Sequence, residues 1–203
     1  KTVHNGIEYG DMQLISEVYA ILRDVVGADN EEMSKIFSTW NEGRLESYLV
    51  EITSEILNEK DENGDYIVNY ILDKAMQKGT GKWTVISALE EGEPVTLITE
   101  AVYARILSSM KSERVAAAKG VEKPRSLPEK KDTVALLEKA LYAAKIISYA
   151  QGFSLMKAAS DHYRWELKLG EIASIWRGGC IIRSAFLNDI RNAYEENAEL
   201  KNL

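Results

Sequence analysis

The stretch from residue 7 to residue 25, IEYGDMQLISEVYAILRDV, decides the fold class of this chain. Its apolar residues return at steps of three and four, which is the spacing of one face of an α-helix. Gly27 follows shortly after, and glycine is the residue type that most often ends a helix. The stretch therefore predicts one long helix that buries one of its sides and closes near Gly27.

The same periodicity continues to the end of the chain, and no segment shows the two-residue alternation of a half-buried strand. The glycine-rich turn at residues 78–81 and Pro94, which suits the first turn of a helix, separate helical segments. We expect an all-α fold with further helices over residues 30–38, 42–58, 66–77, 82–91, 94–119, 133–160, 162–169 and 171–194.

Composition excludes several classes of protein. The 203 residues carry 25 Lys and Arg against 32 Asp and Glu, a formal net charge of −7, which argues against a surface that coats nucleic acid. No apolar run approaches the roughly 18 residues of a membrane span. Two histidines and one cysteine are too few for a structural zinc site, so we expect no metal. The single cysteine, Cys180, suits a reducing, cytoplasmic setting and is expected to be a buried thiol.

The chain carries a candidate internal repeat. Residues 36–43 (IFSTWNEG) align with residues 172–179 (IASIWRGG), and residues 19–22 with 153–156. Between them, residues 119–131 hold two of the three prolines and five basic side chains without amphipathic pattern, which predicts a surface loop. We expect one helical domain over residues 1–203, with a first copy at 1–118, a linker at 119–131 and a truncated second copy at 132–203. Chance similarity of amphipathic helices is the alternative.

The two ends of the sequence predict that the chain is a piece of a longer protein. Amphipathic pattern starts at residue 1 with neither an initiator Met nor a capping residue, and the last helix runs into a polar tail.

A polar strip near the start of the chain is a candidate site. Lys1, His4, Asn5 and Glu8 stand at i, i+3, i+4 and i+7 and so share one helical face, with Tyr9 beside them. The strip offers a proton acceptor, a proton donor and two hydrogen-bonding groups. On spacing alone, an ordinary solvated stripe is the commoner explanation.

Two further segments can bind an anion. The turn KGTG at residues 78–81 resembles a nucleotide P-loop only superficially, because Trp83 stands where that motif needs Ser or Thr. Its backbone N–H groups, with Lys78 and Thr80, can nevertheless hold a phosphate, unless it is a plain connector. Arg105 lies among apolar residues, which favours an ion pair with the nearby Glu100, although a substrate anion would serve equally.

Four segments in order resemble the helical domain of the 6-phosphogluconate dehydrogenase family: residues 1–9 (KTVHNGIEY), 78–84 (KGTGKWT), 149–153 (YAQGF) and 176–184 (WRGGCIIRS). The one departure is Thr2, where that family usually has Met. The resemblance implies a homodimeric, NADP-dependent oxidoreductase of the pentose phosphate pathway. Its reaction is the oxidative decarboxylation of 6-phosphogluconate to ribulose 5-phosphate.

The resemblance also implies residue roles. Lys1 is the general base at the substrate 3-hydroxyl, and Glu8 is the acid that protonates C1 of the enediol. His4 and Asn5 hold substrate hydroxyls or the carboxylate. The phosphate is gripped by Tyr9, Lys78, Thr80 and Arg105. A lysine base needs a pKa well below its usual value of about 10.4, and the pKa of Glu8 must move upward.

The NADP-binding domain is expected to be absent, because no Gly-x-Gly-x-x-Gly follows a strand. The residues that bind the cofactor are therefore unknown, and we expect the isolated chain to be inactive. Two alternatives stay open: a non-catalytic helical interaction module, and a hydroxyacid dehydrogenase for an unphosphorylated substrate.

Overall fold

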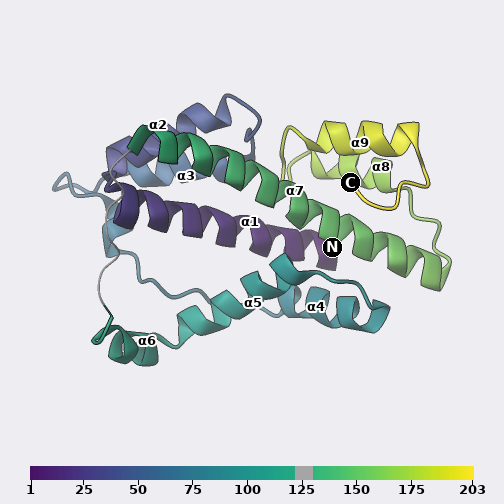
Figure 1. The fold of residues 1–203 in the computed structure, drawn as a ribbon, viewed down its shortest axis with the longest axis horizontal. Helices are drawn as coiled ribbons and strands as arrows, with labels where there is room; N and C mark the ends of the chain where they lie inside the picture. Colours follow the sequence, from purple (N-terminus) through teal and green to yellow (C-terminus); the bar gives the residue numbers. More distant parts are fainter. Residues whose placement is uncertain (122–129) are drawn as a thin grey trace.

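Two long helices run side by side through the middle of the molecule, α1 (Thr2–Ile21) and α7 (Lys130–Tyr163) (Figure 1). The computed structural model describes residues 1–121 and 130–203. At one end α2 (Asn30–Asn41) packs on α3 (Tyr48–Asn58), and at the other α8 (Leu169–Trp176) pairs with α9 (Leu187–Glu196). Along the remaining side of α1 lie α4 (Thr80–Glu91) and α5 (Thr96–Ser109), followed by α6 (Lys111–Ala118). Over the described ranges the all-α prediction is confirmed, since only two isolated β-bridges occur there.

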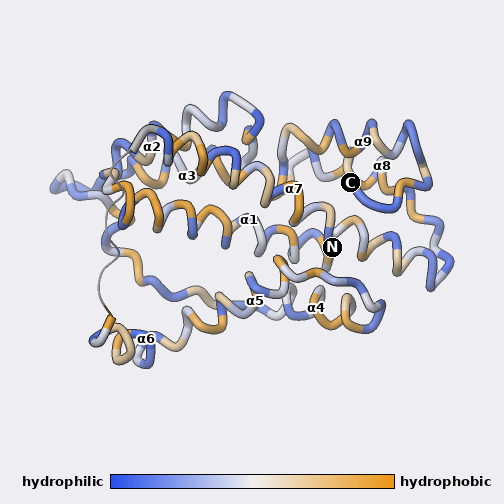
Figure 2. The backbone as a smooth tube through the Cα atoms, viewed as in Figure 1, coloured by the Kyte–Doolittle hydropathy of each residue, from blue (hydrophilic) through white to orange (hydrophobic). Residues whose placement is uncertain are grey.

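The first helix forms as its sequence predicts. Ile7, Ile15 and Val18 are buried along one side of α1, and Figure 2 shows hydrophobic positions recurring along it. The helix passes into a π-helical turn, Leu22–Val26, and closes at Gly27, whose φ of 71° lies in the left-handed region that glycine adopts at no steric cost.

The two larger hydrophobic cores use α1 and α7. One core joins them to α2 and α3 through Leu22, Phe37 and Leu141. The other joins them to α8 and α9 through residues such as Ile7 and Phe153. The central helix pair is therefore the scaffold on which both ends of the molecule are built.

A glycine lets the two central helices approach closely. A Cβ atom added at Gly152 of α7 would lie 2.5 Å from Cδ1 of Ile7 on α1. Any side chain at Gly152 would therefore push the helices apart.

Two predicted helices in the first half of the chain need correction. Helix α3 starts at Tyr48 and not at residue 42, because the Ser47 hydroxyl accepts a hydrogen bond from the Val50 N–H and caps the helix there. Residues 66–77 form only a 3₁₀ turn, Ile67–Tyr70, followed by extended chain. Hydrogen bonds from Lys111 and Arg114 of α6 hold this chain through Asp73 and lower the pKa of that carboxyl to about 2.

Three helices predicted from the periodicity are wrong in extent. The segment 94–119 breaks at Met110 into α5 and α6. Residues 162–169 do not form a helix, since Arg164 and Glu166 have φ angles of 57° and 53°. The segment 171–194 divides into α8 and α9, because Gly179, with φ 73°, turns the chain between them.

The predicted linker falls mainly on residues 122–129, which lie outside the described residues. On either side of it, a long helix is followed by a short helix, a turn and another helix. The two turns meet in an antiparallel bridge between Ser47 and Ser184, where the Tyr48 N–H donates to the Arg183 carbonyl.

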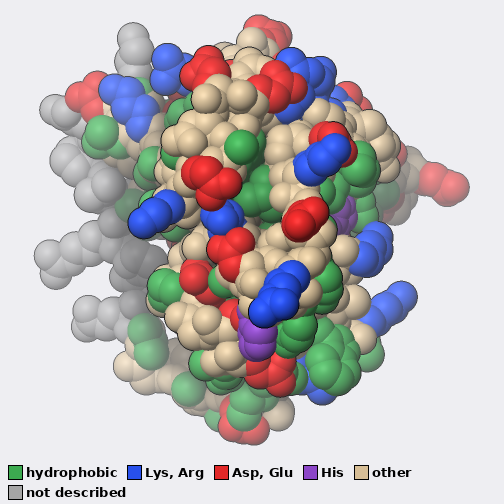
Figure 3. All heavy atoms as spheres, turned by 90° about the vertical axis from the view of Figure 1, so that its right-hand side faces the viewer, with side chains coloured by type: hydrophobic (Ala, Val, Ile, Leu, Met, Phe, Trp, Pro, Cys, Tyr) green, Lys and Arg blue, Asp and Glu red, His purple; other side chains and the backbone are tan. Residues whose placement is uncertain are grey.

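The surface carries mixed charge. Acidic and basic side chains are interspersed with hydrophobic ones over the face that holds the α8–α9 end (Figure 3). Within residues 1–121 and 130–203, no helix combines the length and hydrophobicity that crossing a bilayer requires.

Candidate functional site

His4 is the most buried polar group of the strip at the start of α1. Its ring Nδ1 lies 3.2 Å from Oδ1 of Asn5 and 4.0 Å from Oε2 of Glu8. Its ring meets Trp176 edge-on, with centroids 5.7 Å apart. Burial lowers the pKa of His4, the bond to Asn5 opposes this, and the charge of Lys1 adds to the lowering. The imidazole is therefore neutral near pH 7 and offers one donor and one acceptor nitrogen.

Glu8 lies one helical turn further on and is half-buried. Burial raises the pKa of its carboxyl, while the positive charges of Arg105 and Lys1 act in the opposite direction. The net direction is upward, so Glu8 holds a proton at higher pH than an ordinary glutamate. A carboxyl in this state can donate a proton in a reaction.

Arg105 of α5 lies over the ring of Tyr9, with its guanidinium carbon 4.0 Å from the ring centroid. Its Nη1 donates to the Met76 carbonyl at 3.0 Å, and Nη2 lies 3.2 Å from the sulfur of Met12. The predicted ion pair with Glu100 is wrong, because the side chain turns toward α1 instead. These three neighbours are neutral and hold the guanidinium in place, while its charge acts on the nearby Glu8 carboxyl.

The glycine turn brings the start of α4 against α1. Gly79 has a φ of 90°, and α4 begins at Thr80 directly after it. A Cβ atom at Gly81 would lie 2.6 Å from Cδ2 of Tyr9, so only glycine allows this contact. Helix α4 thereby presents its first backbone N–H groups close to the Tyr9–Arg105 pair.

The structure brings together most of the predicted site residues. Asn5, Glu8, Tyr9 and Arg105 gather around the first turns of α1, with His4 buried beside them. Thr80 begins α4, and the next residue, Gly81, contacts Tyr9. Lys1 and Lys78 are exposed. The Lys1 charge acts on both His4 and Glu8. Within the described part of the chain, no hydrogen bond or ion pair joins the Lys78 side chain to the other predicted site residues.

Three residues with roles at this site were not predicted. Trp176 orients His4, and Thr84 of α4 donates its hydroxyl to the Thr2 carbonyl at 2.8 Å. Gln151 of α7 accepts hydrogen bonds through Oε1 from the N–H groups of Leu97 and Ile98, and so caps α5 from outside. All three lie in the motifs that carry the family resemblance, but those motifs alone assign them no task.

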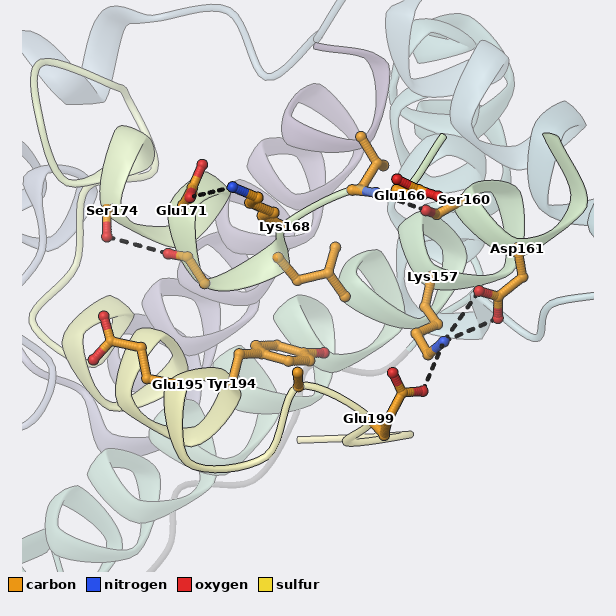
Figure 4. A pocket seen from close by; sticks show the side chains of 14 residues that line it. Lys157, Ser160, Asp161, Glu166, Lys168, Glu171, Ser174, Tyr194, Glu195 and Glu199 are labelled. Atoms are coloured by element: carbon orange, nitrogen blue, oxygen red, sulfur yellow. Dashed lines mark hydrogen bonds and ion pairs between the residues drawn. The ribbon is translucent and has the colours of Figure 1, made fainter. Parts of the chain in front are cut away.

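Two cavities lie near the α8–α9 end of the molecule, and one of them reaches the start of α1. One, of about 570 Å³, lies between the end of α7 and α9, where the ammonium of Lys157 lies between Asp161 and Glu199 (Figure 4). It contains none of the predicted site residues. The other, of about 710 Å³, is lined by Lys1 together with apolar residues of α7 and α8.

Comparison with known proteins gives a consistent result. The family model described as "6-phosphogluconate dehydrogenase, C-terminal domain" matches residues 1–203. Decarboxylating 6-phosphogluconate dehydrogenases of Salmonella typhimurium and Escherichia coli are 55% and 54% identical to the chain over all of its length. The chain spans 44% of each of these relatives.

A solved structure agrees in fold. The 6-phosphogluconate dehydrogenase of Plasmodium falciparum superposes with a TM-score of 0.96 at 49% identity, covering all of this chain and 44% of that one. That protein is described in its apo form, with its cofactor NADP⁺ and with its substrate 6-phosphogluconate. Taken with the helical fold and the geometry of the α1–α4–α5 cluster, these matches show that the chain belongs to the 6-phosphogluconate dehydrogenase family and corresponds to its C-terminal domain.

Proposed function

We propose that this chain supplies the substrate-binding and acid–base residues of a decarboxylating 6-phosphogluconate dehydrogenase. The observation that carries the proposal is the position of Arg105, fixed by Tyr9 and Met76 close to Glu8. An anion-binding guanidinium and a carboxyl of raised pKa within one cluster suit a phosphorylated sugar acid. The phosphate binds at Arg105, Thr80 and Lys78, and the sugar chain extends along α1 toward Lys1.

The proton transfers are then assigned along α1. Lys1 takes the proton of the substrate 3-hydroxyl as that carbon is oxidised, and the resulting 3-keto acid loses its carboxylate as CO₂. Glu8 protonates C1 of the enediol, which releases ribulose 5-phosphate. His4 and Asn5 hold the hydroxyl and carboxylate groups of the substrate. The raised pKa of Glu8 supports its role as the acid.

The oxidation itself needs NADP, which accepts the hydride when bound. The described residues do not fit a dinucleotide site of the usual kind, because residues 1–121 and 130–203 contain no strand leading into a glycine-rich phosphate turn. We therefore assign no residue of this chain to the cofactor and expect no NADPH production by the chain alone.

Binding of 6-phosphogluconate to the 203-residue chain tests the proposal directly. Calorimetry should show binding to the wild-type chain, and Arg105→Ala should weaken it by about 10-fold to 150-fold, the cost of one charge-assisted contact. Arg23→Ala is the matched control, because Arg23 lies in the π-helical turn beyond the far end of α1 and pairs with Asp24. Failure of the wild-type chain to bind would refute the proposal.

The same titration separates the two alternatives. A non-catalytic interaction module would not distinguish the sugar acid from other anions. A hydroxyacid dehydrogenase for unphosphorylated substrates would bind gluconate as well as 6-phosphogluconate. Our proposal requires that gluconate binds at least about 10-fold more weakly, because the phosphate contacts are lost.

The proposal also includes an internal repeat, a cellular location and an oligomeric state. Residues 1–118 and 132–203 are copies of one helical unit, supported by the recurring helix order and the Ser47–Ser184 bridge. The working enzyme is a cytoplasmic homodimer. Large apolar side chains exposed on α5 and α6, among them Tyr103, Leu107 and Val115, support a partner surface.

A further inference from the structure

Thr84 lies between the two helix starts that carry the proposed site. Its side chain is fully buried, and its Oγ1 lies 2.8 Å from the carbonyl oxygen of Thr2 on α1. The carbonyl oxygen of Thr80, in its own helix, is 3.3 Å from the same atom. A hydroxyl has a single proton, and the shorter distance assigns it to Thr2, so the bond joins α4 to α1.

The side chain of Thr84 packs directly between α4 and α1. A Cβ atom at Gly6 of α1 would lie 2.6 Å from Cγ2 of Thr84 and 2.8 Å from Oγ1. The threonine side chain therefore rests directly on the α1 backbone, with no side chain of Gly6 between them. Its methyl group packs against the α1 backbone, and its hydroxyl makes the bond that aligns the two helices.

The first turn of α1 receives a hydrogen bond from α4. Lys1 stands at the N-cap position and provides no side-chain capping bond. The bond from Thr84 holds the Thr2 carbonyl, which lies in that same turn, between Lys1 and His4.

We propose that Thr84 is a positioning residue that fixes the acid–base end of the site relative to its phosphate end. Thr2 is next to Lys1, at the acid–base end of the site. Thr80 lies one helical turn before Thr84, at the phosphate end. The hydrogen bond from Thr84 to Thr2 therefore connects the two ends of the site. The inference rests on the proposed function, because it assigns Thr84 a task in holding 6-phosphogluconate. Thr84 itself touches no reacting atom.

Three variants of the 203-residue chain test this role. Thr84→Val keeps the shape and removes the hydroxyl, whereas Thr84→Ser keeps the hydroxyl and removes the methyl group. Thr53→Val is the matched control: Thr53 also donates to a helix carbonyl, that of Leu49, but lies on α3 away from the site. Thr84→Ala repeats the test if the valine variant does not fold.

Two measurements are made on each variant. Amide hydrogen exchange reports the opening of the first turn of α1, and calorimetry reports the dissociation constant for 6-phosphogluconate. Thr84→Val should speed exchange at the amides of residues 5–8 and weaken binding, each by about 10-fold, the effect of one hydrogen bond of ordinary strength. Thr84→Ser should restore both to within about threefold, and Thr53→Val should change neither.

The outcomes distinguish this inference from the proposed function. Unchanged exchange and unchanged binding in Thr84→Val, or an effect that Thr84→Ser does not restore, would overturn the role of Thr84. An equal effect in Thr53→Val would do the same, because it would show a general loss of stability. If the wild-type chain binds no 6-phosphogluconate, the proposed function fails, and the exchange measurement alone decides whether Thr84 holds the first turn.

Discussion

The Nζ atom of Lys145 lies 2.6 Å from Oδ2 of Asp11, and both side chains are buried, with 0% and 1% of their surface exposed. Asp11 follows Glu8 by three residues on α1, and Lys145 comes from the facing part of α7. Nearby, the Tyr149 hydroxyl donates to the Ile182 carbonyl at 2.6 Å. This group of polar contacts joins both central helices to the turn between α8 and α9.

Removing the cation of this pair should be costly. Burial raises the pKa of Asp11, and the charge of Lys145 is the main effect that opposes this rise. In Lys145→Met the carboxylate loses its partner, and we expect the free energy of unfolding to fall by about 3–5 kcal/mol. Urea unfolding measures this loss, which should shrink at acidic pH, where Asp11 takes up a proton.

Two further variants distinguish the stability lost by breaking the ion pair from the stability lost by burying its charges. The double variant Asp11→Leu/Lys145→Met removes both charges, and we expect it to recover most of the lost stability. Lys157→Met removes a more exposed partner of Asp161 and should cost less than about 1 kcal/mol. A double variant as unstable as Lys145→Met would show that the charges themselves stabilise the helix pair.

Glu8 should destabilise the folded chain at neutral pH. Its pKa in the folded chain is raised above the ordinary 4.5, so its contribution to stability is complete below pH 4.5 and is lost as pH rises through the raised value. Glu8→Gln should therefore raise the urea midpoint at pH 7 and leave it nearly unchanged at about pH 4. Glu17→Gln, at an exposed position on the same helix, is the control, and an equal gain there would contradict the assignment.

The sequence predicts where helices occur more accurately than where they begin and end. Periodicity identifies α1 because its buried positions follow one another in the chain. It fails at residues 66–77, where the pattern is helical but the pairing of Asp73 with Lys111 and Arg114 holds the segment extended. That contact spans about forty residues, and local pattern carries no information about it.

The candidate site, too, could be predicted only in part from the sequence. The strip from Lys1 to Glu8 follows from helical spacing, but its meeting with Arg105 depends on how α5 packs on α1. The sequence favours an ion pair with Glu100 because that residue is near in the chain. The cation–π contact with Tyr9 replaces it because the helices bring that ring within 4.0 Å. Arg105 could therefore be named as a candidate from the sequence, but not placed.

Gln151 should stabilise the helix that carries Arg105. Helix α5 has no side-chain cap of its own at Val95, and Gln151 of α7 accepts hydrogen bonds from its first N–H groups at 3.0 and 3.3 Å. Gln151→Leu leaves these donors without a partner, which should lower the free energy of unfolding by about 1–3 kcal/mol. Gln13→Leu, which removes only a side-chain bond to Glu17, should cost less. Equal losses would argue against a capping role.

Replacing Gly81 with alanine should disturb the site more directly than the same change at any other glycine. A Cβ atom there would lie 2.6 and 2.7 Å from two ring carbons of Tyr9 and 2.9 Å from a methyl group of Val102. Gly81→Ala must therefore move the ring on which Arg105 rests, and we expect both a loss of about 1–3 kcal/mol in stability and weaker binding of 6-phosphogluconate.

The control for this prediction is Gly120→Ala, because no atom of the described residues lies within 4 Å of a Cβ atom at Gly120 and its φ is not in the left-handed region. An alanine there should leave binding unchanged and can slightly raise stability by restricting the unfolded chain. Stability comes from urea unfolding and affinity from calorimetry on the same samples. If Gly81→Ala loses stability but binds as the wild-type chain does, the Tyr9–Arg105 contact does not position the phosphate group, and the anion must be held by other residues of α4.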